Sequence, residues 1–118
     1  MIRRNGEGKL ASRKMFDGDG EAQFYSVLNG AEEMYGKGRL FSIVTLEKGC
    51  EVGYHVHHGD GETYFILSGE GEYNDNGTLT VLHPGDTSFT DDGEGHSLKC
   101  ISDEPLKVVA LILYTNIQ

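Results

Sequence analysis

The stretch of residues 49–69 decides the fold, and it reads GCEVGYHVHHGDGETYFILSG. One residue separates His55 from His57, so in a β-strand both imidazoles lie on the same face. The glycines and the aspartate of residues 58–61 predict a tight hairpin turn. Beyond that turn, Glu62 is expected to face the histidines from the neighbouring strand. Divalent first-row metals accept imidazole and carboxylate ligands, so the stretch predicts a metal site.

A second group of spaced residues follows this stretch and comprises Gly85, Asp91, Gly93, His96 and Cys100. In the first stretch, Gly49 and Gly69 flank the two histidines and Glu62. Together the two groups resemble the two sequence motifs of the cupin superfamily. The first motif matches at every position, whereas the second departs at two. Asp91 stands where the family usually has proline, and Cys100 stands where it usually has asparagine. These departures concern loop rigidity and pocket polarity rather than the metal-binding histidine.

The resemblance implies an all-β fold, a double-sheet jelly-roll barrel of about six to eight strands in a single domain. It also implies one divalent metal ion in the barrel mouth, held by four side chains: His55, His57, Glu62 and His96. Four nitrogen and oxygen ligands leave one or two coordination positions open for a substrate or water. This ligand set suits manganese, iron, nickel or zinc, and the sequence does not choose among them. We interpret His58 and His83, which lie in turn sequences, as surface residues.

The composition independently indicates an all-β chain with many turns. It includes seventeen glycines and two prolines in 118 residues, and the pair Asn76-Gly77 is a strong hairpin signal. Residues 1–38 are predicted to form an N-terminal arm and leading strands, and residues 39–118 the barrel core, within one structural domain. Apolar and β-branched patterns predict strands at 21–28, 40–47, 63–67, 78–82, 87–90, 97–102 and 106–114, and a single helical turn at 31–35.

The net charge of −9 is unevenly distributed along the chain. Residues 1–14 hold five basic groups and one acidic group, a local charge of +4, while the rest of the chain carries −13. An acidic body repels phosphate backbones, so we expect no nucleic-acid partner. No apolar run approaches the ~18 residues of a membrane span and no secretory signal is evident, so we expect no membrane partner and a cytoplasmic location. The two cysteines are then interpreted as free thiols.

Strand alternation predicts which side chains form the wall of the pocket. If Glu62 and His96 point into the barrel, the residues at even spacing on the same strands do so as well, namely Tyr64, Ile66, Leu98 and Cys100. Phe65 and Leu67 then point outward and need cover, which predicts a homodimer. Three acidic residues at positions 91, 92 and 94 are expected at the rim of the pocket, where they would disfavour highly anionic substrates.

Three functions are compatible with these patterns. The first is a small metalloenzyme of the dioxygenase, decarboxylase, isomerase or cyclase class that acts on a small polar or aromatic molecule. The sequence identifies no catalytic residue for it, because Glu62 is expected to be occupied as a metal ligand. The second function is a non-catalytic module that binds a small molecule or a metal. The third is a metal-free structural barrel, which the complete ligand set disfavours.

Overall fold

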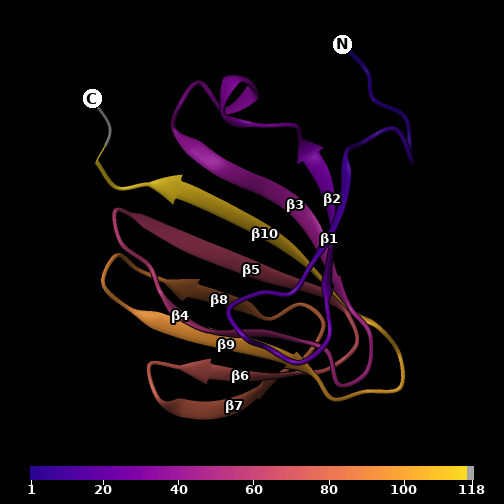
Figure 1. Cartoon of the computed structure of the whole chain (residues 1–118), viewed down its shortest axis with the longest axis vertical. Helices are drawn as coiled ribbons and strands as arrows, with labels where there is room; N and C mark the ends of the chain where they lie inside the picture. Colours follow the sequence, from indigo (N-terminus) through magenta and orange to yellow (C-terminus); the bar gives the residue numbers. More distant parts are fainter. Residues whose placement is uncertain (117–118) are drawn as a thin grey trace.

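The structure, a computed structural model, describes residues 1–116, and these residues form ten β-strands in two antiparallel sheets that face each other (Figure 1). The six-stranded sheet has the order β1 (Leu10–Arg13), β2 (Ala22–Leu28), β3 (Gly38–Leu46), β10 (Leu106–Tyr114), β5 (Asp60–Ser68), β8 (Thr87–Thr90). The four-stranded sheet has the order β4 (Glu51–Val56), β9 (Gly95–Cys100), β6 (Gly71–Asp75), β7 (Thr78–Leu82). The predicted all-β, double-sheet jelly-roll fold is confirmed, with ten strands in the described residues where about six to eight are expected. The last two residues of the predicted barrel core, 117 and 118, lie outside the described residues.

Local sequence explains most of these elements. The predicted hairpin joins β6 to β7, and its two turn residues, Asn76 and Gly77, have φ values of 51° and 99°. Positive φ at both positions is the conformation that Asn-Gly supplies in a two-residue hairpin loop. A 3₁₀ turn, η1 (Ala31–Met34), lies where a single helical turn is predicted. Within residues 1–116 no helix is long and apolar enough to cross a membrane.

The hairpin predicted at residues 58–61 is wrong. Strand β4 pairs with β9 in the four-stranded sheet, whereas β5 pairs with β8 and β10 in the six-stranded sheet. The turn after β4 therefore carries the chain from one sheet to the other, with Gly59 at φ 78°. Asp60 and Gly61 already belong to β5. The consequence is that Glu62 faces the histidines across the barrel interior rather than from an adjacent strand.

The space between the two sheets is filled by the hydrophobic core. Its largest fully buried members include Leu46, Ile66, Leu98, Leu106 and Val108. Side chains from both sheets alternate between this core and the outer surface, which is the expected pattern of a sandwich with one buried face per sheet. The core adjoins the cavity of the candidate site, and Phe24, Val44, Val52 and Tyr64 belong to both.

The segment between β1 and β2 forms a strap across β4. Met15 makes an isolated parallel bridge with Val52, and its carbonyl accepts a hydrogen bond of 2.9 Å from the Gly53 amide. A Cβ atom at Gly53 would lie 2.1 Å from the Phe16 carbonyl oxygen, so this close approach requires glycine. Phe16 itself has φ 53°, which is uncommon for a bulky residue. The strap thus places Met15 and Phe16 in the wall of the cavity beside His55.

Candidate metal centre

Three strands and one turn position the four predicted metal ligands. His55 on β4 and His96 on β9 are direct cross-strand partners, so their side chains leave the sheet on the same face. His57 follows the last residue of β4, and Glu62 projects from β5 in the opposite sheet. His57, Glu62 and His96 are buried, and His55 is partly exposed. Within residues 1–116 these four form the one group of three or more His, Cys, Asp and Glu side chains close enough together to hold a metal ion.

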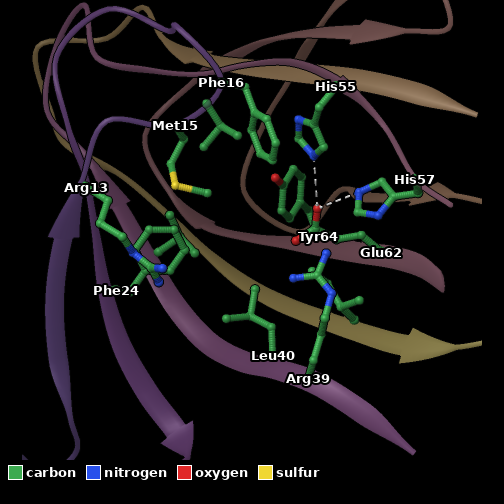
Figure 2. A pocket seen from close by; sticks show the side chains of 13 residues that line it. Arg13, Met15, Phe16, Phe24, Arg39, Leu40, His55, His57, Glu62 and Tyr64 are labelled. Atoms are coloured by element: carbon green, nitrogen blue, oxygen red, sulfur yellow. Dashed lines mark hydrogen bonds and ion pairs between the residues drawn. The ribbon is translucent and has the colours of Figure 1, made fainter. Parts of the chain in front are cut away.

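The donor atoms of these side chains converge on one point. The Nε2 atom of His96 lies 3.1 Å from Nε2 of His57 and 3.1 Å from Nε2 of His55. The Oε1 atom of Glu62 lies 3.0 Å from Nε2 of His96, 3.2 Å from that of His57 and 3.9 Å from that of His55. Figure 2 shows His55 and His57 directed at the Glu62 carboxylate from one side of the cavity.

The opposite ring nitrogens fix the tautomers of two histidines. The Nδ1–H of His55 donates to the Gly53 carbonyl oxygen at 2.8 Å, and the Nδ1–H of His57 donates to Asp60 Oδ1 at 2.6 Å. Because Nδ1 carries the proton, Nε2 of each neutral ring presents a lone pair to the centre. A carbonyl or carboxylate partner on the outer nitrogen is the usual support of a metal-binding histidine.

The third histidine is held by two hydroxyl groups. Nδ1 of His96 lies 2.9 Å from the Tyr73 hydroxyl and 2.9 Å from the Thr90 hydroxyl, which are themselves 2.7 Å apart. The Tyr64 ring stacks on His96, with centroids 5.1 Å apart and an interplanar angle of 13°. His96 is thereby locked in orientation, with Nε2 aimed at the same point as the other donors.

The donor set fits a divalent ion. An ion about 2.1 Å from each donor, with neighbouring donors at right angles, places those donors about 3 Å apart. Four of the separations between donors lie between 3.0 and 3.2 Å. Lone pairs that meet at this spacing without a proton between them repel one another, and a cation at their centre removes the repulsion. His55, His57, Glu62 and His96 can therefore hold a metal ion.

Electrostatics prepares the site for a cation. Burial alone would raise the pKa of Glu62, but the hydrogen bonds that His57 and His96 donate when their Nε2 atoms carry a proton outweigh it and lower the pKa to about 2. Burial lowers the pKa of His55, so this ring is neutral at pH 7. The hydrogen bond with Glu62 raises the pKa of His57 above 6.5, with burial opposing this effect and Asp60 adding to it. The carboxylate is ionised at neutral pH, and protons compete with a metal at His57.

Acidification should therefore release the metal. Binding requires unprotonated Nε2 atoms, so the affinity for metal should fall as the pH drops through the pKa of His57, which lies above 6.5 in the metal-free protein. Dialysis of metal-loaded protein at successive pH values, followed by elemental analysis, measures this loss. Metal retention that stays flat down to about pH 4 would contradict a site dominated by histidine.

A cavity of about 90 Å³ opens beside the metal centre, between the strap and the six-stranded sheet (Figure 2). Phe16 forms part of its wall and stacks on His55, with centroids 4.0 Å apart and an interplanar angle of 12°. Arg13, whose guanidinium lies over the Phe24 ring at 5.0 Å, and Arg39 also line it. The remaining lining residues are Met15, Phe24, Leu40, Val44, Val52, His57, Glu62, Tyr64 and Ile112.

The structure separates the four side chains predicted for the pocket wall. Tyr64 lines the cavity, and burial, followed by the charge of Glu62, raises its pKa well above 10.0. Its hydroxyl is thus a neutral donor at physiological pH. Ile66, Leu98 and Cys100 point into the interior, as alternation predicts, but they lie in the core and are absent from the residues that line the cavity.

The acidic residues predicted for the rim lie elsewhere. Asp92 accepts hydrogen bonds from the Gly59 amide and from the Thr115 hydroxyl, and Glu94 accepts one from the Asp91 amide. None of the three acidic residues lines the cavity, where the charged side chains apart from the predicted ligands are arginines. The predicted bias against anionic substrates therefore has no basis in the cavity.

Sequence reasoning missed three kinds of residue at this site. Asp60 precedes Glu62 by two positions on β5, so the alternation that placed Tyr64 inward would have found it. The glycines on either side of Asp60 predict a hairpin turn instead. Arg39 follows the first residue of β3, and no local pattern marks it. Phe16 reaches the site only because the strap crosses β4, which no sequence signal predicts.

Fold and site together define a class of protein, a small two-sheet barrel with three histidines and one glutamate at its open end. The family model described as a cupin domain matches residues 42–112, more than half of the chain. The chain belongs to the cupin family.

Relatives within the family are similar over most of their length. An oxalate-binding protein of Thermotoga maritima is 40% identical over 99 residues, which cover 84% of this chain and 81% of that protein. The crystal structure of a predicted oxalate decarboxylase from Thermotoga maritima is similar with a TM-score of 0.90 and 37% identity, covering 97% of this chain and 99% of that one. KdgF from a Halomonas species has a TM-score of 0.72 at 15% identity, covering 98% and 94%, a likeness of fold alone.

Proposed function

We propose that this protein binds one divalent metal ion through His55, His57, Glu62 and His96, and that it uses the ion to bind a small dicarboxylate of the oxalate class. The observation that carries the proposal is the cavity, which joins three of the four metal donors to the guanidinium groups of Arg13 and Arg39. The similar Thermotoga maritima sequence is named oxalate-binding and the similar Thermotoga maritima structure a predicted oxalate decarboxylase, and both names support the same ligand class.

Charge explains why this cavity suits a dianion. A divalent ion held by three neutral imidazoles and one carboxylate keeps a net charge of +1. Arg13 adds to it, while Asp60 offsets the charge of Arg39. The chain as a whole carries a net charge of −9. These groups make the cavity locally positive, which favours the binding of anions. When bound, the metal acts as a Lewis acid that grips carboxylate oxygens at its open positions. The volume of about 90 Å³ restricts the ligand to a small molecule.

Binding is better supported than catalysis. Among the residues that line the cavity within the described chain, the carboxylate and the imidazoles belong to the predicted metal ligands. Tyr64 keeps its proton at neutral pH because its pKa is raised. A general acid or base needs a pKa near the working pH, and the cavity offers none that is free. The metalloenzyme predicted from the sequence is therefore the second candidate, with oxalate decarboxylation as its reaction.

Calorimetry should separate these possibilities. Oxalate should bind at least ~100-fold more tightly to manganese-loaded protein than to metal-free protein, because contacts with the ion supply several kcal/mol. Acetate, with one carboxylate, should bind more weakly than oxalate. Elemental analysis after the titration checks that oxalate has not removed the metal.

Two results would change the proposal. Equal affinity of the metal-loaded and metal-free protein for oxalate would remove the role of the metal, and no binding by either would overturn the function. Formate and carbon dioxide released in equal amounts under air would identify a decarboxylase instead.

Two further expectations remain predictions. The first is that the chain forms a homodimer through the outer face of the six-stranded sheet. The second is that it works in the cytoplasm, without a membrane or nucleic-acid partner.

A further inference from the structure

We propose that Arg39 recognises the part of the carboxylate ligand that faces away from the metal, and that Asp60 holds Arg39 and the metal ligand His57 in one unit. This inference rests on the proposed function and names the residues that would give it specificity. It concerns two side chains that the sequence motifs do not include, one on β3 and one on β5.

Asp60 has one carboxylate oxygen for each partner. Its Oδ1 accepts the hydrogen bond from His57 Nδ1 at 2.6 Å, and its Oδ2 accepts one from Arg39 Nε at 2.9 Å. The side chain is buried, with 5% of the residue exposed. A buried carboxylate with a short charge-assisted bond on each oxygen has little freedom to move. The positions of the metal ligand and of the guanidinium are therefore fixed by the same group.

The guanidinium of Arg39 is only partly used by the protein. Its Nε–H bonds to Asp60, and within residues 1–116 neither terminal amino group has a protein partner. The side chain lines the cavity and is 48% exposed. Figure 2 shows its guanidinium extending from β3 toward Glu62, on the side of the cavity where the metal ligands meet.

This arrangement matches the geometry of carboxylate recognition. With Nε occupied, the two terminal amino groups still form a fork whose parallel N–H bonds fit both oxygens of one carboxylate group. Arg13 is placed differently, because its guanidinium lies over the Phe24 ring and no carboxylate of the described chain holds it. Arg39 is thus the guanidinium that the fold has preorganised beside the metal donors.

A purely structural ion pair is the competing explanation. Because Asp60 is buried, the pair would serve folding on this explanation, and a structural role would affect stability rather than the choice of ligand. The two explanations differ in what happens to oxalate binding when metal occupancy is held constant.

The test compares Arg39→Ala with wild-type protein, both saturated with manganese. We expect unchanged metal affinity within about 3-fold, and a loss of oxalate affinity of roughly 10- to 100-fold, the range of a hydrogen bond to a charged group. Added guanidinium ion should restore part of the lost affinity by occupying the vacated space. Arg39→Lys should be intermediate, because it keeps the charge and loses the fork. Arg4→Ala, on the exposed N-terminal arm, is the matched control and should bind oxalate normally.

Asp60→Ala tests the coupling. It should lower metal affinity by about 10- to 100-fold, as loss of an outer partner of a ligand histidine does. At saturating metal it should also lower oxalate affinity, and adding Arg39→Ala to it should cost little more. Circular dichroism and thermal melting identify any variant that fails to fold, and Arg39→Lys then supplies the comparison.

The inference and the proposed function fail differently. If wild-type protein binds oxalate through the metal and Arg39→Ala binds it equally well, the role of Arg39 is overturned while the function stands. If Asp60→Ala loses metal affinity but keeps full oxalate affinity at saturating metal, Asp60 does not position Arg39. If wild-type protein does not bind oxalate at all, the proposed function itself is wrong.

Discussion

Replacing His57 with alanine should strip the purified protein of its metal and leave the barrel folded. His57 supplies one of four donors, and its Nε2 lies 3.1 Å from that of His96 and 3.2 Å from Glu62. Losing a ligand should cost more than losing an outer-shell partner, so we expect a fall in metal affinity of at least ~100-fold. Elemental analysis of protein purified without a metal-affinity resin measures the effect. The hydrophobic core does not include this side chain, so the circular dichroism spectrum should not change.

The matched control is His83→Ala. His83 lies in an exposed turn between β7 and β8, with 60% of its side chain accessible, and takes no part in the cluster. It should keep about one metal ion per chain. Full metal occupancy in His57→Ala would show that the ligand assignment is wrong, and equal loss in both variants would show that the loss is not specific to the cluster.

The resemblance of two spaced motifs to the cupin superfamily predicted the jelly-roll fold and the proposed ligand set, including the distant His96, while short-range patterns predicted the strands and turns. His55 lies on β4 and His57 directly follows its last residue, so the alternation that places both rings on one side acts over two residues. The hairpin at residues 76–77 follows from backbone conformations that Asn and Gly adopt easily. Each of these signals acts within a few residues of chain, where alternation and turn chemistry are reliable.

Long-range placement could not be obtained in this way. Arg39 reaches Asp60 only because β3 and β5 flank β10 in one sheet, and strand order is not encoded by local pattern. Phe16 reaches His55 because a strap crosses β4 with Gly53 beneath it. The hairpin error at residues 58–61 has the same origin, since a glycine-rich turn connects strands equally well within a sheet or between two sheets.

The outer face of the six-stranded sheet leads to the second large prediction, a homodimer. Four large apolar side chains on this face are exposed: Phe65 (42%), Leu67 (45%), Phe89 (61%) and Leu113 (48%). Strand pairing shows that Phe89 and Phe65 share a face. Phe89 is the cross-strand partner of Thr63 on β5. Thr63 precedes Phe65 by two residues, so both point to the same side of the sheet. A contiguous apolar surface on neighbouring strands is typical of an interaction site. A second copy of the chain could cover it by two-fold pairing, the commonest assembly of soluble proteins.

Phe65→Glu should dissociate this dimer without removing metal. Light scattering of the wild-type protein should give about 26 kDa, twice the 13.0 kDa of the chain, because an interface of standard size holds at micromolar concentration. A carboxylate buried without a partner costs several kcal/mol, so the dissociation constant should rise at least ~100-fold in the variant. Metal content should stay the same, because Phe65 faces away from Glu62 on β5.

Leu79→Glu is the matched control, since Leu79 is 62% exposed on β7 of the other sheet. A wild-type monomer at micromolar concentration would rule out the dimer, and dissociation by Leu79→Glu alone would move the interface to the four-stranded sheet.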